Sequence, residues 1–475
     1  MNGETVPAAL AVCGGTVITP AGAELADVRI DGDVISAIDP VTEMATEPAT
    51  ARHPGRRVID ADGCIVLPGA VDAHAHVGLP YVRLDRTVVW SADRFPEASK
   101  AAAVGGTTTI IDFVMQSPGE DLLAPLSERL AFIQASTVDV ALHCWIMDAS
   151  DRVLGQVPEL VARGVPSFKA FMAYSQLGSP MSDGELFALF EAVAAAEGLL
   201  ALHAENASLN ARRIAAAVRE GRAGFEHFAA TRPAVGEEEA VSRALIFAGA
   251  TGAQAYFVHV STAAAVQRIA DARARGQRAW VETCPHFLLF DEHQYEGERA
   301  GDFLMAPPLR TESDQRALWK AIVSGGVDVV ATDHSAWPRA VKNYGDGFPG
   351  SIQGVAGLGL QLPLLAAATH VRDDFDWTTI ARVTAEDPAR IFGLYPRKGV
   401  IRAGSDADLV IVDPDAIEPV APIPPHWAVD NCIYSGLPAI YPKLVLRRGE
   451  ELSRSGTYVG SPTGTGEFIP GALDY

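Results

Sequence analysis

The chain has 475 residues, of which 48% are hydrophobic and 20% are charged, and its formal net charge is -21. This length predicts a globular protein of two or three domains, unless a single barrel takes most of the chain. The negative charge argues against nucleic acid and anionic membranes as partners, because both repel an acidic surface.

The cysteines and the N-terminus indicate a cellular location. The five cysteines are unpatterned and none belongs to a CxxC pair: Cys13, Cys64, Cys144, Cys284 and Cys432. Such a set is typical of reduced thiols inside a cell rather than of a disulfide framework. Residues 1–10 show no basic region followed by a long apolar run, and no apolar segment reaches membrane-spanning length. We therefore expect a cytoplasmic protein with no membrane partner.

Residues 8–66 have the pattern of short antiparallel strands. Apolar and polar residues alternate on both sides of an Asp-Gly-Asp turn at residues 31–33. Alternation across an Asp-Gly turn predicts a β-hairpin.

From about residue 64 to 395 the pattern changes. Short apolar segments such as "TTTIIDFV" and "LLALHAEN" alternate with alanine-rich helical segments such as "TAAAVQRIADARARG". About eight repeats of strand and helix predict an α/β fold, a (β/α)₈ TIM-like barrel. The alternative is an open doubly wound sheet, which usually has fewer units and a glycine-rich loop after its first strand. No GxGxxG follows the first strand here.

Strand patterns return after residue 395. The simplest account is a small β-sandwich domain built from residues 1–64 and 396–455, with the metal-dependent catalytic barrel, residues 65–395, inserted between them. Residues 456–475 are rich in Gly, Ser and Thr and are expected to form an extended C-terminal tail. This tail could lie against a neighbouring subunit or be partly disordered.

Metal-ligand side chains stand at the ends of several predicted strands. In a strand, side chains two apart point to the same face, so His74 and His76 aim at one point. Barrel enzymes place their chemistry at the C-terminal strand ends. The residues at these ends are His74, His76, Lys169, His203, His259 and Asp333. Each has an ordinary alternative: a hydrogen-bonded histidine near the core, or an aspartate that caps a helix. The neighbouring His143, His286 and His334 are assigned to supporting hydrogen bonds.

Lys169 is the hardest of these residues to explain as structural. It stands inside "VPSFKAFMAY", and a buried ammonium without a partner costs several kcal/mol. Either its pKa is lowered, as in a Schiff-base enzyme, or CO2 converts it to a carbamate. A carbamate has two oxygens and could bridge two divalent ions, each with two histidines and one with an aspartate as well.

Motifs from residue 60 to 415 resemble one family. In order they are "PGAVDAHAH", "GGTTTIIDFV", "SFKAFMAY", "HAEN", "HVST", "ETCPH", "APPLR", "TDHS", "DPARIFGLYPRKG" and "AGSDADLVIVDP". The chain thus resembles the amidohydrolase superfamily, and within it the dihydropyrimidinase/hydantoinase group of cyclic amidohydrolases.

The resemblance implies an enzyme with two divalent ions, Zn2+ by expectation. His74, His76 and Asp333 would hold one ion, His203 and His259 the other, and Lys169, carboxylated by CO2 to N6-carboxylysine, would bridge them. A hydroxide between the metals would attack a small cyclic amide, Asp333 would carry the proton, and Tyr174 would hydrogen-bond the oxyanion. Ala306, Asp346 and Gly347 match the positions that hold the ring. Family members are commonly homodimers or homotetramers.

Departures from the family pattern concern the substrate. Ala306 replaces a small polar residue, and Asp346 stands near a usual asparagine. Gly78 replaces the polar residue of relatives that bind carboxylate-bearing rings, which favours a neutral dihydropyrimidine, hydantoin or related ureide or imide. The loop of residues 78–95 is longer than usual and carries Arg83 and Arg86, which loop statistics place on the solvated surface.

Three alternatives stay open. "CPH" and "TDHS" are similar to allantoinases, so allantoin is the second substrate candidate. A non-catalytic dihydropyrimidinase-like scaffold is the alternative of another class, although all six ligand positions are filled. A Schiff-base lyase that uses Lys169 is the third.

Overall fold

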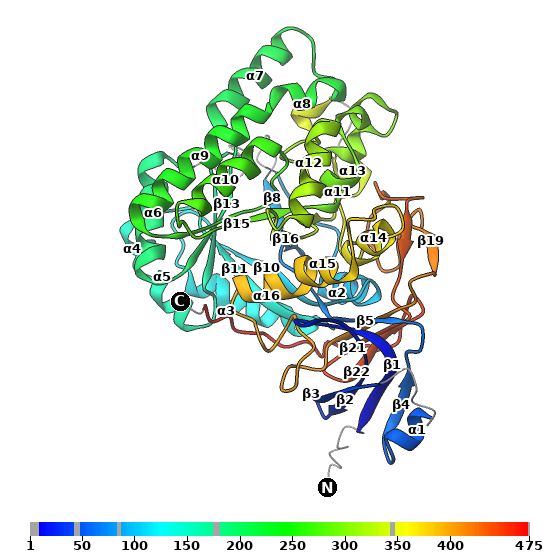
Figure 1. Ribbon diagram of the computed structural model, residues 1–475. Helices are drawn as coiled ribbons and strands as arrows, with labels where there is room; N and C mark the ends of the chain where they lie inside the picture. The colour runs from blue at the N-terminus through cyan, green and yellow to red at the C-terminus, as the bar shows by residue number, and fades with distance from the viewer. Residues whose placement is uncertain (1–8, 42–47, 83–86, 174–180, 343–346, 474–475) are drawn as a thin grey trace.

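The computed structural model describes residues 9–41, 48–82, 87–173, 181–342 and 347–473. Eight parallel strands follow one another in chain order around a barrel (Figure 1). They are β6 (Ala70–Asp72), β10 (Thr107–Met115), β11 (Asp139–Trp145), β12 (Ser167–Phe171), β13 (Leu199–His203), β14 (Gln254–Phe257), β15 (Ala279–Thr283) and β16 (Val329–Val330). At the mouth, the short strands β7 (Ala75–His76) and β17 (His334–Ser335) pair in parallel and join the first barrel strand to the last. The predicted TIM-like barrel is confirmed.

Helices cover the outside of the barrel. Those between or after the barrel strands are α2 (Phe95–Val104), α3 (Leu123–Phe132), α4 (Asp151–Leu154), α5 (Val157–Ala162), α6 (Asp183–Ala195), α7 (Ala207–Arg219), α8 (Phe228–Thr231), α9 (Ala234–Thr251), α10 (Ala263–Ala274), α11 (Pro285–Leu289), α12 (Glu312–Val323), α13 (Arg339–Lys342), α14 (Gln361–Ala368), α15 (Trp377–Ala381) and α16 (Asp387–Ile391). Because helices cover one face of each barrel strand and the barrel interior the other, β11 and β13 are buried along their whole length.

A second, mixed sheet of nine strands combines both ends of the chain. Its members are β1 (Leu10–Thr19), β2 (Gly22–Asp31), β3 (Val34–Pro40), β4 (Arg57–Asp60), β5 (Ile65–Pro68), β18 (Leu409–Val412), β21 (Leu444–Arg447), β22 (Glu450–Arg454) and β23 (Thr457–Tyr458). β5 lies between β1 and β18, so the N-terminal and C-terminal strands pair directly (Figure 1). The expected joining of the two chain ends in one β unit is confirmed.

The smaller elements extend the barrel loops. A hairpin of β8 (Pro80–Val82) and β9 (Val88–Trp90) follows β7, and β19 (Ile417–Pro419) pairs with β20 (Pro438–Ile440). α1 (Ala49–Arg52) precedes β4. Short 3₁₀ turns lie at Ile133–Ala135, Phe225–His227, Glu292–Glu296, Ala300–Phe303 and Phe348–Gly350, and a π turn at Arg382–Glu386 joins α15 to α16. Among the described residues, no helix is both long enough and apolar enough to cross a bilayer.

The last described residues close the base of the barrel. After β23, the chain runs beneath the barrel, where Val140 donates a backbone hydrogen bond to Glu467 and accepts one from Ile469. The Ile469 side chain is 1% exposed and belongs to the apolar cluster that fills the barrel interior. Residues 464–472 therefore pack on their own chain, and contact of this segment with a neighbouring subunit stays a prediction.

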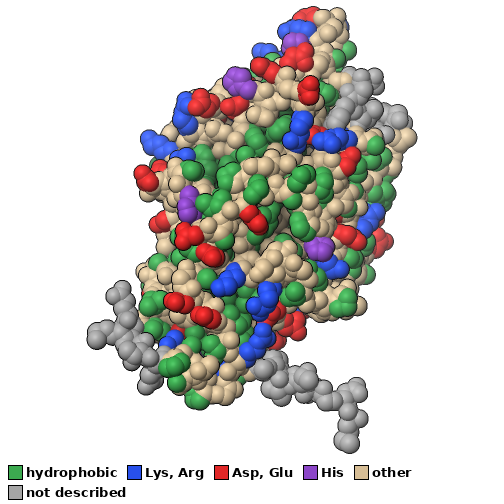
Figure 2. Space-filling view, turned by 90° about the vertical axis from the view of Figure 1, so that its right-hand side faces the viewer, with side chains coloured by type: hydrophobic (Ala, Val, Ile, Leu, Met, Phe, Trp, Pro, Cys, Tyr) green, Lys and Arg blue, Asp and Glu red, His purple; other side chains and the backbone are tan. Residues whose placement is uncertain are grey.

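The surface that Figure 2 shows carries acidic and basic side chains interspersed among apolar ones. The described part of that face shows no continuous region of one charge. The net charge of -21 is therefore not gathered into one acidic patch there.

Candidate metal centre and active site

Six side chains at the mouth of the barrel line one pocket of about 680 Å³, which is partly open to solvent. They are His74 after β6, His76 in β7, Lys169 in β12, His203 at the end of β13, His259 after β14 and Asp333 between β16 and β17. The structure thus brings the whole predicted ligand set to one place. Which ion each residue holds stays a prediction.

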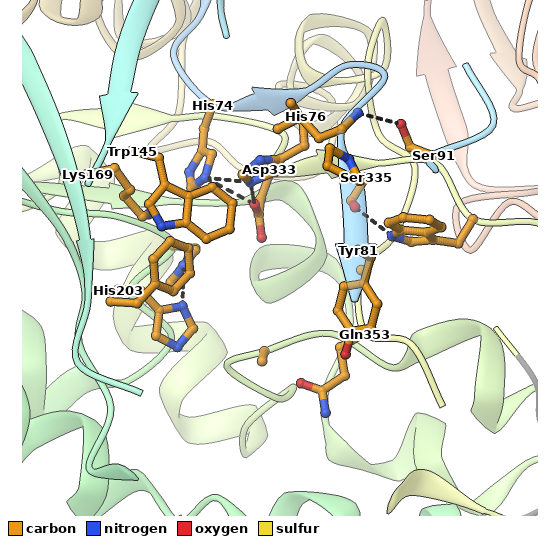
Figure 3. A pocket seen from close by; sticks show the side chains of 17 residues that line it. His74, His76, Tyr81, Ser91, Trp145, Lys169, His203, Asp333, Ser335 and Gln353 are labelled. Carbon is orange, nitrogen blue, oxygen red and sulfur yellow. Dashed lines mark hydrogen bonds and ion pairs between the residues drawn. The ribbon is translucent and has the colours of Figure 1, made fainter. Parts of the chain in front are cut away.

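Three of these side chains meet at one point (Figure 3). Nε2 of His74 lies 3.2 Å from Nε2 of His76 and 3.2 Å from Oδ1 of Asp333. Nε2 of His76 lies 3.3 Å from the same oxygen. Two imidazole nitrogens and one carboxylate oxygen that face each other are a donor set suited to a zinc-type ion.

A second pair of histidines lies on the other side of the pocket. Nδ1 of His203 is 3.0 Å from Nε2 of His259. Nε2 of His203 donates to Oε2 of Glu205 at 2.8 Å, which leaves Nδ1 as the lone-pair donor. Burial lowers the pKa of both imidazoles, so both stay neutral, which is the form that binds metal.

Lys169 provides the test of whether these residues fit a two-metal site. Its side chain is fully buried, and among the described residues Nζ has no hydrogen-bond partner. Nζ lies 5.1 Å from the ring centroid of Phe171 and 6.0 Å from that of Phe113. Burial lowers the pKa of Lys169 to about 8, so a substantial neutral fraction is available to react as an amine. An orphaned amine between two sets of metal ligands fits a bridging carbamate.

Two buried carboxylates hold the histidines in place. Oε1 of Glu282 lies 2.7 Å from Nδ1 of His74 and accepts the backbone N–H of His259 at 2.9 Å. Oε2 of Glu282 accepts the Tyr256 hydroxyl at 2.8 Å. Burial raises the pKa of Glu282 to about 8, so a cation in the site would be the charge that keeps this carboxylate ionised.

The sequence pattern alone predicts no role for Glu282 or Glu205. Glu205 is held by Arg232 as well as by His203. A signal for Glu205 existed, because it follows His203 by two residues in "HAEN". Glu282 sits on β15, far from His74 in sequence, so only the closed barrel shows that it contacts both His74 and His259.

The backbone is strained at two of the six positions. His259 has a φ of 41° and Asp333 has a φ of 47°, a left-handed conformation that residues with side chains rarely adopt. Such a conformation costs about 1–3 kcal/mol and persists at functional sites where the surrounding structure imposes it. His259 lies two residues after the end of β14 and Asp333 three residues after the end of β16, and both side chains line the pocket.

The rest of the pocket is mostly aromatic and neutral. Trp145, Phe171, Tyr81 and Trp337 form its walls together with Leu79, Pro80, Ser91, Ala306, Ser335, Gln353 and Gly354. In the view of Figure 3, Tyr81 and Gln353 lie to the right of His74 and His203. No arginine stands among the described lining residues. The described pocket therefore offers no guanidinium to pair with a carboxylate on a substrate.

The predicted ring-binding residues divide into three groups. Ala306 lines the pocket. Gly347 instead packs against Ala223, so closely that a Cβ there would come within 2.1 Å of the Ala223 carbonyl oxygen, and it is not among the described lining residues. Tyr174, Asp346 and the loop arginines Arg83 and Arg86 lie outside the described residues. The amide and glycine that do reach the pocket are Gln353 and Gly354, which the sequence analysis did not single out.

A second group of potential ligand atoms lies in the nine-stranded sheet and does not fit an ion. Cys13, Asp27 and His53 bring their ligand atoms within 4.8 Å of one another. The Asp27 carboxylate, however, already accepts two hydrogen bonds from Arg52, one from His53 and one from a backbone N–H. Burial raises the pKa of the Cys13 thiol to about 12, so it is not a thiolate. We assign this group to structural stability.

The comparisons with known proteins agree with the architecture of the site. Residues 65–438 match the model of the amidohydrolase family. The chain belongs to the amidohydrolase family. All six convergent side chains lie inside the matched residues.

Similar amidohydrolases include hydantoinases and dihydropyrimidinases. The chain is 34% identical to the D-hydantoinase of Streptomyces coelicolor, over 97% of each chain. It superposes with a TM-score of 0.91 on the D-hydantoinase from a Bacillus sp. AR9 at 32% identity, covering 98% of this chain and 100% of that one. It gives the same TM-score with the dihydropyrimidinase from Brevibacillus agri at 30% identity and the same coverage.

Proposed function

We propose that this amidohydrolase opens cyclic amides of the hydantoin or dihydropyrimidine type with two divalent ions, Zn2+ by expectation. The observation that carries the proposal is the Lys169 amine. It is buried, has no partner among the described residues, and lies in the pocket where two separate ligand groups converge. The names of the similar proteins support the reaction class.

The distances between the side chains suggest how the six residues would divide between the two ions. His74, His76 and Asp333 would hold one ion, His203 and His259 the other, and carboxylated Lys169 would bridge both. When bound, the ions supply a hydroxide near neutral pH and polarise the amide carbonyl.

Asp333 is suited to move the proton. It is the one carboxylate among the described residues that line the pocket, and its side chain is 16% exposed. Burial would raise the pKa of Asp333, but His74 and His76 outweigh it and hold the pKa below the usual range. At neutral pH Asp333 is therefore a base, which can take the proton of the attacking water and pass it to the leaving nitrogen. The oxyanion role of Tyr174 stays a prediction from the resemblance.

The walls of the pocket favour a neutral ring with an apolar substituent. Trp145, Phe171 and Trp337 supply aromatic surface, and Gln353 and Ser335 supply neutral polar groups. A carboxylate-bearing ring would lose its hydration there without gaining a guanidinium partner from the described lining residues. The argument from Gly78 leads to the same expectation, that neutral ureides and imides are better substrates than acidic rings.

One experiment tests the metal and the substrate together. The protein is purified with bicarbonate and Zn2+ present, its metal is measured by elemental analysis, and ring opening is followed for dihydrouracil, hydantoin, 5-substituted hydantoins, cyclic imides and allantoin. We expect about two ions per chain and the fastest opening with a neutral hydantoin or dihydropyrimidine. A protein that takes up no metal would support the scaffold alternative, and a preference for a carboxylate-bearing ring would contradict the pocket argument.

The Schiff-base alternative has its own test. Borohydride reduces an imine to a stable amine, so a lyase that uses Lys169 would become covalently labelled by a carbonyl substrate. Because histidines and an aspartate surround Lys169, we expect no labelling. The predicted homodimer or homotetramer is a separate proposal, which light scattering in solution would test.

A further inference from the structure

A second fully buried lysine lies behind the part of the pocket wall that contains Ala306, Gln353 and Gly354. Lys342, the last residue of α13, is 0% exposed. Its Nζ donates to three backbone carbonyls: Gly354 at 2.9 Å, Asp302 at 3.0 Å and Leu304 at 3.4 Å. Three carbonyl oxygens satisfy the three donors of an ammonium. Unlike Lys169, this lysine has a complete set of partners.

These carbonyls belong to two different walls of the pocket. Leu304 lies two residues before Ala306, which lines the pocket, and Gly354 lines it directly beside Gln353. The Gly354 N–H also donates to the Leu304 carbonyl at 2.8 Å. Lys342 and this backbone hydrogen bond therefore connect the Leu304 segment directly to Gly354.

The segment that contains Gly354 also contacts the chain next to Asp333. Ser335, which follows Asp333 by two residues, donates its backbone N–H to the Val355 carbonyl at 2.8 Å. A Cβ on Gly354 would come within 2.9 Å of the Ser335 side chain, so the two segments are in close contact. The position of Gly354 is thus fixed from one side by the strand end that carries Asp333 and from the other by Lys342.

α13 itself is anchored to the same wall. Arg339 makes two hydrogen bonds to the Asp302 carboxylate, at 3.0 Å and 2.7 Å. The backbone carbonyl of Lys342 accepts the Ile352 N–H at 3.1 Å. Both ends of this one-turn helix therefore hold a pocket segment, and the lysine lies where the segments meet.

We propose that Lys342 is a positioning residue that sets the distance between the Ala306 wall and the Gln353–Gly354 wall, and thereby how tightly the ring of the substrate is held. This inference rests on the proposed function for the identity of the substrate, but not for the geometry. Lys342 does not line the pocket in the described structure, so it acts through the backbone that it holds.

The test replaces Lys342 by methionine, which keeps the length of the side chain and removes its donors. Because the walls hold the ring in both ground state and transition state, we expect KM for dihydrouracil or hydantoin to rise about tenfold or more, while kcat changes less than about threefold. Metal content should stay at the wild-type value. The matched control is Lys320→Met, an exposed lysine on α12, which should change neither constant.

Amide hydrogen exchange gives a readout that needs no turnover. In Lys342→Met, we expect faster exchange confined to residues 304–306 and 352–355, including the Gly354 N–H. A variant that is less thermostable but keeps the wild-type KM and exchange pattern at these residues would overturn the inference. If the wild type opens none of the rings, the proposed function fails, and local exchange alone then decides the inference. Unchanged exchange in both segments would overturn it.

Discussion

The two ends of the barrel use a buried lysine in opposite ways. At the mouth, Lys169 is buried without a hydrogen-bond partner among the described residues. At the base, Nζ of Lys398 lies 2.6 Å from Asp139, 2.9 Å from Asp406 and 2.8 Å from Asp408. A buried ammonium whose partners all lie in the chain fits a structural role, whereas a buried amine without partners among the described residues fits a role in ligand binding.

The base also joins three separate parts of the chain. Asp139 begins β11 of the barrel, Asp408 directly precedes β18 of the nine-stranded sheet, and Glu467 of the C-terminal segment donates its backbone N–H to Asp139 at 2.8 Å. Burial would lower the pKa of Lys398, but the three carboxylates outweigh it and raise the pKa above its usual value. The contacts of Lys398 and Asp139 therefore link the barrel, the nine-stranded sheet and the C-terminal segment at the base.

The largest effect is expected at the mouth. Lys169→Ala removes the proposed bridge, so we expect loss of bound metal and a fall in ring-opening rate of about 10³-fold or more, as when a group on which the whole site depends is removed. Elemental analysis and a hydrolysis assay measure the two quantities. The matched control is Lys320→Ala on the exposed face of α12.

Chemical rescue sharpens this prediction. Acetate or propionate in the buffer should partly restore activity to Lys169→Ala, because a small carboxylate can replace the carbamate oxygens. A Lys169→Ala protein with full activity and a full complement of metal would contradict the two-metal model.

At the base, Lys398→Met should reduce stability and leave the chemistry intact. It leaves buried carboxylates without their cation, which costs about 3–5 kcal/mol. We expect the free energy of unfolding in urea to fall by about this amount, while KM and metal content of the folded protein stay unchanged. A variant that keeps wild-type stability would show that Arg447 and Arg448, which also face Asp139, suffice to hold this carboxylate.

The pH dependence of this loss of stability follows from the directions in which the pKa values of Asp139 and Lys398 are shifted. Burial would raise the pKa of Asp139, but Lys398 and the neighbouring arginines outweigh it and lower this pKa. The stabilisation that ionised Asp139 contributes to the folded state is therefore present above the unfolded pKa of about 3.9 and is lost as the pH falls. Because the pKa of Lys398 is raised, the stabilisation that its ammonium contributes is present below about pH 10.4 and is lost as the pH rises further. The stability difference between wild type and Lys398→Met should therefore be constant from about pH 5 to 9 and shrink below about pH 4.

The C-terminal segment has a smaller effect at the same end. Ile469→Ala removes a side chain that is 1% exposed and packs in the cluster inside the barrel. Truncation of a buried isoleucine costs about 2–4 kcal/mol, so thermal unfolding should begin at a lower temperature with kcat unchanged. The control is Val459→Ala, at a position that is 48% exposed on the same segment. Equal destabilisation by both variants would mean that the segment is held by its backbone hydrogen bonds and not by Ile469.

The barrel and the residues at its mouth could be predicted from the sequence. The alternation of strand and helix predicts the barrel, because each repeat needs a partner to bury its apolar face. The convergence of the six side chains could be predicted because five of them stand at or shortly after a strand end, a place that the sequence pattern locates, and Lys169 stands within the fourth barrel strand. The cost of burying Lys169 follows from its apolar neighbours alone.

The supporting residues could not be predicted, because they depend on distance across the closed barrel. Gln353 and Gly354 reach the pocket through a loop without periodicity, and the sequence analysis chose Asp346 and Gly347 of the same loop instead. Lys342 stands in the polar segment "RAVKN", where nothing marks it as buried. Glu282 and His74 are 208 residues apart in the chain. Such contacts appear only when the strands are placed side by side.

Glu282 offers the smallest and most selective change at the mouth. Glu282→Gln keeps the size of the side chain but weakens the bonds to His74 and to the His259 N–H, so both ion sites lose a support. Loss of such a partner typically lowers metal affinity about 10–100-fold, and we expect competition with a chelator to show a loss in this range. Glu191→Gln, on the exposed face of α6, is the matched control. Because Glu282 contacts one histidine of each predicted ion site, both ions should weaken together. Loss of only one ion would show that the two sites are supported independently.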